Sequence, residues 1–336
     1  MEFITWELLF LIKDLDISIV VQGAISEETK KCLQSLRREF PNSQIILSTW
    51  NGSNIEGLDY DDVVYSEDPG AIIIDKKSNT KNNINRQLVS TKAGLKYANR
   101  KYILKTRTDI LWKNSNIKSF FGKYDRVYKP KHLKNRIIVC NYYTRNPRVM
   151  PLPFHVSDWI TFGNNEDIKL LYDIENEDFN EMRWFENRER KYKRFYTNLL
   201  TRYVPEQYVC INFAKKYYEF DCECFYDISK NNIKITEEIL ACDFYVLDYE
   251  KHLDISFLKY NPNRYYERYT LISNKQWMEL LFEYYEKANK YIKLKRKGRN
   301  IIVRIFFILR QNILMLLHKL HIKEKVKRVL NKNKIL

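Results

Sequence analysis

The alternation of short apolar runs with helix-like stretches in the first third of the chain constrains the fold most. Strands are predicted at residues 17–21, 44–50, 62–65 and 101–105, and helices at 27–38 and 85–97. Apolar strands separated by amphipathic helices are typical of βα units around a sheet that is buried on both faces. The sequence therefore predicts an α/β protein with a mostly parallel central sheet.

The rest of the chain is expected to complete this domain and to add a tail. Apolar runs at 137–140 and 159–162 predict further strands of the same sheet. Helices are expected near 181–202 and 274–292. We expect one domain over residues 1–290, followed by a tail over residues 291–336.

Polar residues follow the carboxyl ends of four predicted strands. They occupy residues 22–24, 48–51, 68–70 and 106–109. In an open α/β sheet, ligands bind in the crevice outside the carboxyl ends of the strands. The sequence therefore predicts a ligand site lined by Gln22, Gly23, Trp50 and Asp68.

The predicted helix that follows residue 82 opens with amides and an arginine. Asn83, Arg86 and Gln87 lie in this opening. Helix N-termini and guanidinium groups both favour a diphosphate. The same residues are also common as helix caps and solvated side chains, and the sequence alone leaves both interpretations open.

Asp109 has the sharpest candidate role, because it follows a strand expected to be buried. A carboxylate there can hold a divalent cation, manganese or magnesium, against a sugar diphosphate. Arg107 stands where an Asp-x-Asp pair would have its first acid, so a protein cation can replace part of the metal charge. We place Lys105, on the same strand, in the binding set as well. The alternative is a surface ion pair between Arg107 and Asp109, and the sequence leaves metal dependence open.

Two later acids are candidates for work on an acceptor. Asp158 can orient an acceptor hydroxyl, with the neighbouring Trp159 stacked on a sugar ring; the alternative puts Trp159 in the core. Glu206, which follows Pro205, can remove a proton from an acceptor hydroxyl as a general base. The alternative is an ordinary helix start at Pro205. His155 is expected to be structural.

Taken together, these segments resemble the WavE-type lipopolysaccharide synthesis family. The resemblance is carried by residues 21–24, 46–50, 66–70, 82–87, 90–95 and 104–109, and more loosely by Ser157, Asp158 and residues 205–207. Order and spacing match over residues 17–112. The first block is specific, and the later matches are short.

The resemblance implies a GT-A-like, Rossmann-type glycosyltransferase domain. Residues 17–112 would then be the nucleotide-sugar-binding half and residues 113–290 the acceptor half. It implies that Gln22 and Gly23 line the nucleotide pocket and that Asp109 is the metal or diphosphate residue. Asn83, Arg86 and Gln87 would lie near the ribose or diphosphate, and Glu206 near the acceptor. Arg107 departs from the two-acid pattern.

The tail carries most of the basic charge of the chain. Residues 291–336 hold 14 Lys and Arg and one acid, so +13 of the net charge of +16 lies there. Residues 301–322 are apolar with a narrow polar stripe, in which Arg304, Gln311 and His318 recur every seven residues. This pattern predicts an amphipathic helix in the plane of a membrane, with basic residues over anionic head groups. Those residues are Lys293, Lys295, Arg296, Lys297, Arg299, Lys325, Lys327 and Arg328. The alternative is a C-terminal helix packed on the core or on a partner.

The remaining features suggest where the protein works. The six cysteines show neither CxxC spacing nor a dense framework, which indicates reduced thiols. The first residues lack a secretion signal. We therefore expect a cytoplasmic protein, peripheral on the inner face of the cell membrane. Nucleic acid is not an expected partner, because basic residues of the tail alternate with long aliphatic runs and no recognition motif is present.

These observations predict a glycosyltransferase that moves a sugar from a nucleotide-sugar donor to a lipopolysaccharide, capsule or other cell-surface glycan. The acceptor would be a glycan or a lipid-linked glycan. Two alternatives stay open: transfer of a sugar-phosphate or alditol-phosphate, and a non-catalytic assembly factor on the membrane with a degenerate transferase fold.

Overall fold

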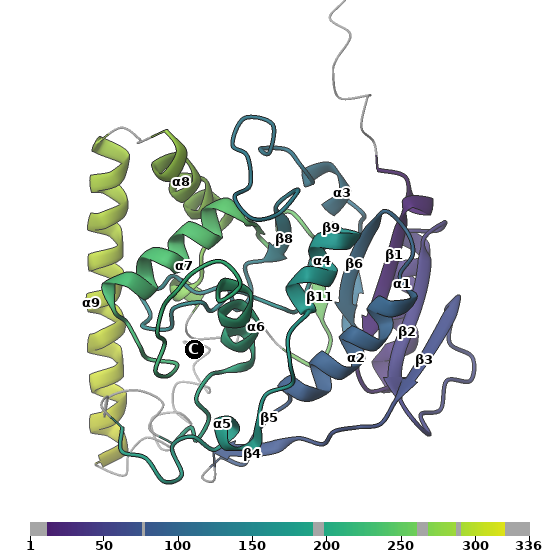
Figure 1. The fold of residues 1–336 in the computed structure, drawn as a ribbon, viewed down its shortest axis with the longest axis horizontal. Helices are drawn as coiled ribbons and strands as arrows, with labels where there is room; N and C mark the ends of the chain where they lie inside the picture. Colours follow the sequence, from purple (N-terminus) through teal and green to yellow (C-terminus); the bar gives the residue numbers. More distant parts are fainter. Residues whose placement is uncertain (1–11, 76–77, 191–197, 261–267, 287–289, 320–336) are drawn as a thin grey trace, which may run out of the picture.

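The computed structural model describes residues 12–75, 78–190, 198–260, 268–286 and 290–319 of the 336-residue chain. Helices pack against a central sheet (Figure 1). The strands are β1 (Ile17–Gln22), β2 (Gln44–Trp50), β3 (Asp62–Ser66), β4 (Ile72–Asp75), β5 (Thr80–Asn82), β6 (Tyr102–Arg107), β7 (Ile110–Trp112), β8 (Ile137–Cys140), β9 (Thr161–Asn164), β10 (Phe244–Leu247) and β11 (Ile255–Phe257). The helices are α1 (Glu27–Glu39), α2 (Ile84–Tyr97), α3 (Ile117–Phe120), α4 (Asn165–Tyr172), α5 (Phe179–Met182), α6 (Pro205–Ala214), α7 (Lys230–Cys242), α8 (Asn274–Tyr285) and α9 (Lys290–Lys319).

The described residues form a seven-stranded central sheet in the order β10-β8-β9-β6-β1-β2-β3. β1 pairs in parallel with β2 and β6, β2 with β3, and β10 with β8. β9 runs antiparallel to both of its neighbours, β6 and β8. All six residues of β1 are buried, as expected for a central strand covered on both faces. The predicted α/β fold with a mostly parallel sheet is confirmed.

Most predicted elements of the first half are present within two residues of their predicted limits. The run at 137–140 is β8, and the run at 159–162 overlaps β9. The helix expected near 181–202 is wrong for the described part of that range, where only the end of α5 is helical. Two guanidinium groups, of Arg188 and Arg202, pack on the ring of Trp184 there. These contacts hold the segment in irregular turns.

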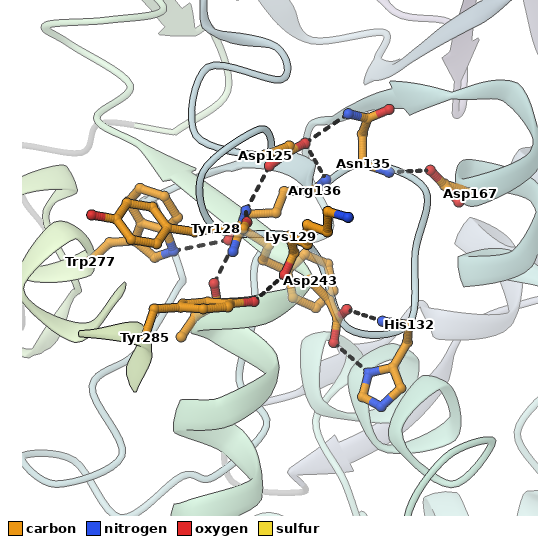
Figure 2. Close-up of polar contacts among 12 residues, drawn as sticks. Asp125, Tyr128, Lys129, His132, Asn135, Arg136, Asp167, Asp243, Trp277 and Tyr285 are labelled. Carbon is orange, nitrogen blue, oxygen red and sulfur yellow. Dashed lines mark hydrogen bonds and ion pairs between the residues drawn. The ribbon is translucent and has the colours of Figure 1, made fainter. Parts of the chain in front are cut away.

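A network of polar contacts joins the loop before β8 to the C-terminal part of the domain (Figure 2). The buried Arg136 donates to Asp125 Oδ1 at 2.7 Å and to the carbonyl of Ala241 at 2.9 Å. Asp243 accepts from the backbone and the ring of His132, at 2.9 and 2.7 Å. An unpaired guanidinium in this core would be costly, so these bonds fix the loop to α7 and β10.

α2 and α4 pack together on the sheet, and α2 contacts β1, β2 and β3. α9 stands at the edge of the molecule, beside α7 and α8 and far from β1 to β3 (Figure 1). The fold therefore presents two separate places of interest. One is the carboxyl edge of the parallel strands, and the other is the outer side of α9.

Candidate functional site

A cavity of about 300 Å³ lies at the carboxyl ends of β1 and β6, next to the start of α2. Its lining residues are Gln22, Gly23, Ala24, Trp50, Asp68, Asn83, Arg86, Gln87, Arg107, Thr108, Asp109, Lys259 and Tyr260. The structure thus brings together nine of the predicted site residues from five separate parts of the sequence. A parallel sheet explains this, because the carboxyl ends of its strands share one edge.

Gly23 ends β1 at a point where a side chain cannot fit. Its φ is +126°, a backbone conformation that L-residues rarely adopt. A Cβ added there would meet Thr108 Oγ1 at 3.1 Å. The Gly23 amide donates to the Ser48 carbonyl at 3.1 Å, and Gln22 Oε1 accepts from Ser90 at 2.9 Å. The turn that follows β1 and lines the cavity is therefore held rigidly.

Arg86 forms one wall of the cavity from the first turn of α2. Its Nε and Nη2 donate to the two carboxylate oxygens of Asp68 at 2.7 and 2.6 Å. The Arg86 hydrogen bond holds the pKa of Asp68 below its usual value. Asn83 lies beside them, and its Oδ1 accepts a longer bond of 3.4 Å from Arg86. The Arg86 side chain keeps 37% of its surface exposed, so it remains accessible to a ligand.

Arg107 also lines the cavity and is bound to Asp109 in the same two-pronged way. Its Nε and Nη2 donate to the two oxygens of Asp109, each at 2.8 Å. The guanidinium lies 4.1 Å from the ring centre of Trp159 and 5.5 Å from that of Tyr260. Burial alone would lower the pKa of Arg107. The hydrogen bonds and the charge of Asp109 outweigh this effect, so the pKa of Arg107 is raised. The alternative interpretation of an ion pair between Arg107 and Asp109 is confirmed, but the pair is not at the surface, because only 5% of the Asp109 side chain is exposed.

The carboxylates of the cavity do not fit a divalent metal as they are arranged. Both oxygens of Asp109 accept from Arg107, and both oxygens of Asp68 accept from Arg86. No cluster of three or more His, Cys, Asp or Glu suited to a metal occurs among the described residues. Asp109 as a metal ligand stays a prediction, and its ion pair with Arg107 is what the structure provides.

Lys105 does not line the cavity, because its side chain is fully buried beneath it. Its ammonium group donates to the backbone carbonyl of Asp158. Burial lowers the pKa of Lys105 to about 8, an effect that the charge of Asp158 partly opposes. The prediction of direct ligand contact by Lys105 therefore needs correction: the residue positions Asp158.

Asp158 and Glu206 lie behind the cavity and do not line it. Gln87, which does line it, donates to the Asp158 carboxylate. Burial and the nearby charge of Asp158 raise the pKa of Glu206 to about 7. Glu206 keeps 12% of its side chain exposed. The two predicted acids are thus brought close to one another, and Gln87 connects them to the cavity.

Pro205 is the first residue of α6, so the ordinary helix start is confirmed, and Glu206 lies in its first turn. His155 Nε2 lies 3.9 Å from Glu206, and its Nδ1 donates to the Tyr143 carbonyl at 2.7 Å. Burial lowers the pKa of His155 to about 3, so the ring is neutral beside Glu206. The structural role expected for His155 agrees with this placement.

Trp159 belongs to the core, as its alternative interpretation proposed, and only 6% of its surface is exposed. It packs against Tyr142, Phe257 and Tyr260 as well as Arg107. A sugar ring therefore cannot stack on it in this arrangement.

Sequence reasoning missed Lys259 and Tyr260, which come from far along the chain. β11 pairs with β7, and the amide of Leu258 donates to the Asp109 carbonyl at 3.0 Å. This pairing carries the residues after β11 over the cavity. The short runs of β7 and β11 gave no sequence signal that they pair, although the aromatic Tyr260 beside Lys259 is a residue type common in ligand sites.

The start of α2 is fixed by a second group of residues that sequence reasoning missed. Asn82 Oδ1 accepts from the amide of Ile84 at 2.8 Å, and Asn82 Nδ2 donates to the buried Glu177 at 2.8 Å. Asn85 Oδ1 accepts from the Glu177 amide at 2.7 Å. Burial raises the pKa of Glu177 to about 8. These contacts hold Arg86 and Gln87 at the cavity.

A larger cavity, of about 590 Å³, contains none of the predicted site residues. It lies at the amino end of β6, near Lys101, Tyr102 and Phe121. The amino ends of parallel strands are not where α/β proteins bind their ligands, so we assign the candidate site to the smaller cavity.

α9 has a packed face and an exposed face. On the packed face, Arg296 donates to Glu283 at 2.6 Å and to Glu237 at 2.8 Å, and Arg299 pairs with Glu279 at 2.6 Å. The prediction that Arg296 and Arg299 contact head groups is therefore wrong, because both charges are neutralised inside the molecule. The alternative of a helix packed on the core is confirmed for this face.

The exposed face of α9 is apolar. Its large exposed apolar residues from residue 301 onward are Ile301, Ile302, Ile305, Phe306, Leu309, Ile313 and Leu316. We call them the apolar stripe. None of the described helices has an apolar stretch long enough to cross a membrane. Lys325, Lys327 and Arg328, which the sequence also placed over head groups, lie outside the described residues.

The fold and the cavity define an α/β protein with a candidate ligand site at the carboxyl edge of its sheet. The chain belongs to the WavE lipopolysaccharide synthesis family, whose pattern matches residues 17–310. The resemblance found in the sequence is thus confirmed over most of the chain. No protein with a curated description matches it significantly.

Solved structures show distant similarity. The 4-diphosphocytidyl-2C-methyl-D-erythritol synthase from Anaerococcus prevotii is 14% identical, with a TM-score of 0.30 over 60% of this chain and 98% of its own. An active-site mutant (Q189E) of LgtC is 12% identical, with a TM-score of 0.31 over 58% of this chain and 69% of its own. The galactosyltransferase LgtC with donor and acceptor sugar analogs is 12% identical, with a TM-score of 0.30 over the same shares.

Proposed function

We propose that this protein is a glycosyltransferase that moves a sugar from a nucleotide-sugar donor to a lipopolysaccharide or related cell-surface glycan. Its membership of the WavE family supports the pathway. The observation that carries the proposal is the cavity, where Arg86 and Arg107 flank the carboxyl ends of β1 and β6. Each guanidinium binds its carboxylate through Nε and Nη2. The remaining N–H groups of Arg86 and Arg107 can donate to the oxygens of a diphosphate.

The other lining residues suit the rest of a nucleotide donor. The side chains of Gln22, Asn83 and Gln87 offer amide donors and acceptors, and Trp50 offers a flat apolar surface. When the donor leaves its sugar, negative charge grows on the diphosphate. Arg86, Arg107 and Lys259 are placed to stabilise that charge.

Glu206 is the proposed general base for the acceptor. A base with a pKa near 7 is effective at neutral pH, and the pKa of Glu206 is raised to about 7 by burial and by Asp158. Asp158 is held by Gln87 and Lys105, so its carboxylate can orient an acceptor hydroxyl beside Glu206. Gln87 contacts both the cavity and Asp158, which connects the donor to the acceptor side.

We also propose that the protein acts at the cytoplasmic face of the membrane through α9. The apolar stripe supports this, because Ile302 is 69% exposed and Leu309 56% exposed on a helix that lines the edge of the molecule. An in-plane amphipathic helix buries such a stripe in the acyl boundary. A lipid-linked acceptor gives a transferase a reason to be held there.

The deciding experiment is a thermal-shift screen of the purified protein with UDP, GDP, CMP and their sugar conjugates, with and without manganese or magnesium. A ligand at a hundredfold excess over its Kd stabilises the folded state by about 2.7 kcal/mol. We expect a shift with one nucleotide class, lost in Asp109→Ala and Arg86→Ala. Arg37→Ala is the matched control, because Arg37 pairs with Asp59 and Asp61 outside the cavity.

A shift that depends on added metal would show that Asp109 leaves Arg107 to bind the ion. No shift with any nucleotide would contradict the transferase proposal and favour the assembly factor. Phosphorus in the acceptor product would favour transfer of a sugar-phosphate or alditol-phosphate.

A further inference from the structure

A further cavity, of about 370 Å³, lies between α9 and the helices α7 and α8. α9 contributes Lys293, Arg296, Lys297, Asn300, Ile301 and Arg304 to its lining. Spacings of four and seven residues put Lys293, Lys297 and Arg304 on one side of the helix. The cavity lies on the element that we propose to contact the membrane, away from the donor site.

The charges in this cavity do not balance. Arg148 and Arg296 both bind Glu237, and Arg296 also binds Glu283 at 2.6 Å. These two arginines and two glutamates neutralise one another. Lys293, Lys297 and Arg304 are exposed and have no carboxylate within ion-pair distance among the described residues. Three positive charges therefore face the cavity without a counterion.

Asn300 provides an independent sign of a missing ligand. It is only 3% exposed, yet it lines the cavity. Its Oδ1 accepts from Asn146 at 3.2 Å, whereas its Nδ2 has no hydrogen-bond partner among the described residues. A buried amide left without an acceptor costs free energy, so such groups are rare. A ligand oxygen would supply the missing acceptor.

The cavity opens onto the apolar stripe. Ile301 belongs both to the lining of the cavity and to the stripe, and Ile305 follows one turn later. A bound molecule with an anionic group in the cavity can thus continue along apolar side chains. An amphiphile has an anionic group joined to an apolar chain in this way, and a soluble anion does not.

We propose that this cavity binds the phosphate of an anionic membrane phospholipid, whose acyl chains lie along the apolar stripe. Lys293, Lys297 and Arg304 neutralise the phosphate, and Asn300 Nδ2 donates to one of its oxygens. The site rests on the proposed membrane association of α9 and adds lipid selectivity to it. Selective capture of a head group would fix how α9, and with it the whole domain, lies on the bilayer.

The test compares two double variants of the full chain that remove the same charge. Lys293→Gln with Lys297→Gln alters the cavity, whereas Lys290→Gln with Lys295→Gln alters exposed lysines of the same helical turns that do not line it. Binding is measured by flotation with phosphatidylcholine vesicles, with and without phosphatidylglycerol. If the lysines act only by general attraction to an anionic surface, both double variants lose binding to a similar extent, by roughly fivefold for each lysine removed. We expect the cavity pair to lose at least tenfold more than its control.

Asn300→Asp tests the buried amide separately, because it keeps the acceptor for Asn146 and puts a negative charge in the cavity. We expect it to weaken binding to phosphatidylglycerol vesicles at least fivefold and to leave binding to neutral vesicles unchanged. Circular dichroism and the melting temperature establish that each variant is folded.

Equal losses in the two double variants would overturn the lipid site while leaving membrane association intact. If the unaltered protein floats with neither vesicle, membrane association itself is wrong. If inorganic phosphate raises the melting temperature without vesicles, and only when Lys293 and Lys297 are present, the site binds a soluble anion and the lipid proposal fails.

Discussion

Arg86 and Arg107 each meet a carboxylate through two hydrogen bonds, but their surroundings differ. Arg86 is 37% exposed at the start of α2, whereas Arg107 is stacked on Trp159 and its partner Asp109 is buried. Removal of an exposed pair costs little stability, and removal of one partner of a buried pair leaves an uncompensated charge.

We therefore predict that Arg86→Ala weakens donor binding at least about tenfold and leaves the melting temperature nearly unchanged. One lost charge-assisted contact of about 1.4 kcal/mol suffices for this effect. Arg107→Ala is expected to lower both donor affinity and stability. Calorimetric titration with the nucleotide and thermal unfolding separate the two effects. An Arg86→Ala variant with full affinity would contradict the assignment of the cavity.

Glu206 gives the activity a predicted pH dependence. With a pKa of about 7, its carboxylate is protonated in acid and becomes a base as the pH rises. We expect kcat/KM to rise about tenfold per pH unit below 7 and to level off above it. Glu206→Gln should lower kcat by about 10²–10⁴-fold and remove this rise. A pH profile that is the same in Glu206→Gln would argue against its role as base.

The same shift predicts an effect on stability, which is a readout independent of activity. The pKa of Glu206 in the folded state lies above its usual value of 4.5. Its contribution to the free energy of unfolding is therefore fully present below pH 4.5. It is lost as the pH rises to about 7. In Glu206→Gln, the free energy of unfolding should lack this loss, as measured by denaturant titration at pH 4.5 and pH 8.

At the level of the elements, the position of α2 depends on a close approach to the sheet. A Cβ added to Gly94 would lie 2.5 Å from Val20 Cγ1 and 3.1 Å from Ser48 Cβ. Glycine thus lets the helix lie directly on β1 and β2, with its first turn at the cavity.

We predict that Gly94→Ala destabilises the protein by about 1–3 kcal/mol, although alanine is the better helix former. Gly298→Ala in α9 is the matched control, because a Cβ there meets nothing within 4 Å. We expect that change to be neutral or to stabilise by up to about 1 kcal/mol. Urea unfolding of both variants measures the difference, and equal effects would show that α2 can shift without cost.

Elements with local signals were predictable from the sequence. The strands β1, β2, β3 and β6 are short apolar runs, and the polar residues after them mark the cavity edge. β11 and β7 were not predictable, because three-residue strands are recognised only by the partner that they find in the fold. The exact neighbours of Asp158 and Glu206 also depend on this packing, so the sequence suggested acids without showing that they share one buried site.

At the level of the whole molecule, the chain uses neighbouring phenylalanines on α9 in opposite ways. Phe306 is 55% exposed in the apolar stripe, and Phe307 is 1% exposed and packs with Leu152, Phe225 and Tyr226. The sequence indicated an amphipathic helix, but it did not show which face the body of the protein covers.

We predict that Phe306→Ser lowers vesicle binding several-fold and leaves the melting temperature unchanged, since each exposed apolar side chain adds to insertion. Phe307→Ala should destabilise the fold by about 3–5 kcal/mol. Flotation and thermal unfolding of both variants test this division. Loss of stability in Phe306→Ser would mean that the stripe is covered by protein.

The pairing of β11 with β7 also sets an order of events during synthesis. Arg107 and Asp109 leave the ribosome early, but Tyr260 and Lys259 complete the cavity only after β11 has been made. A nascent chain that ends before Ile255 therefore has an open sheet edge at β7 and an incomplete cavity. If the cavity binds the donor as we propose, the growing polypeptide would gain this ability late, when most of the domain has already emerged.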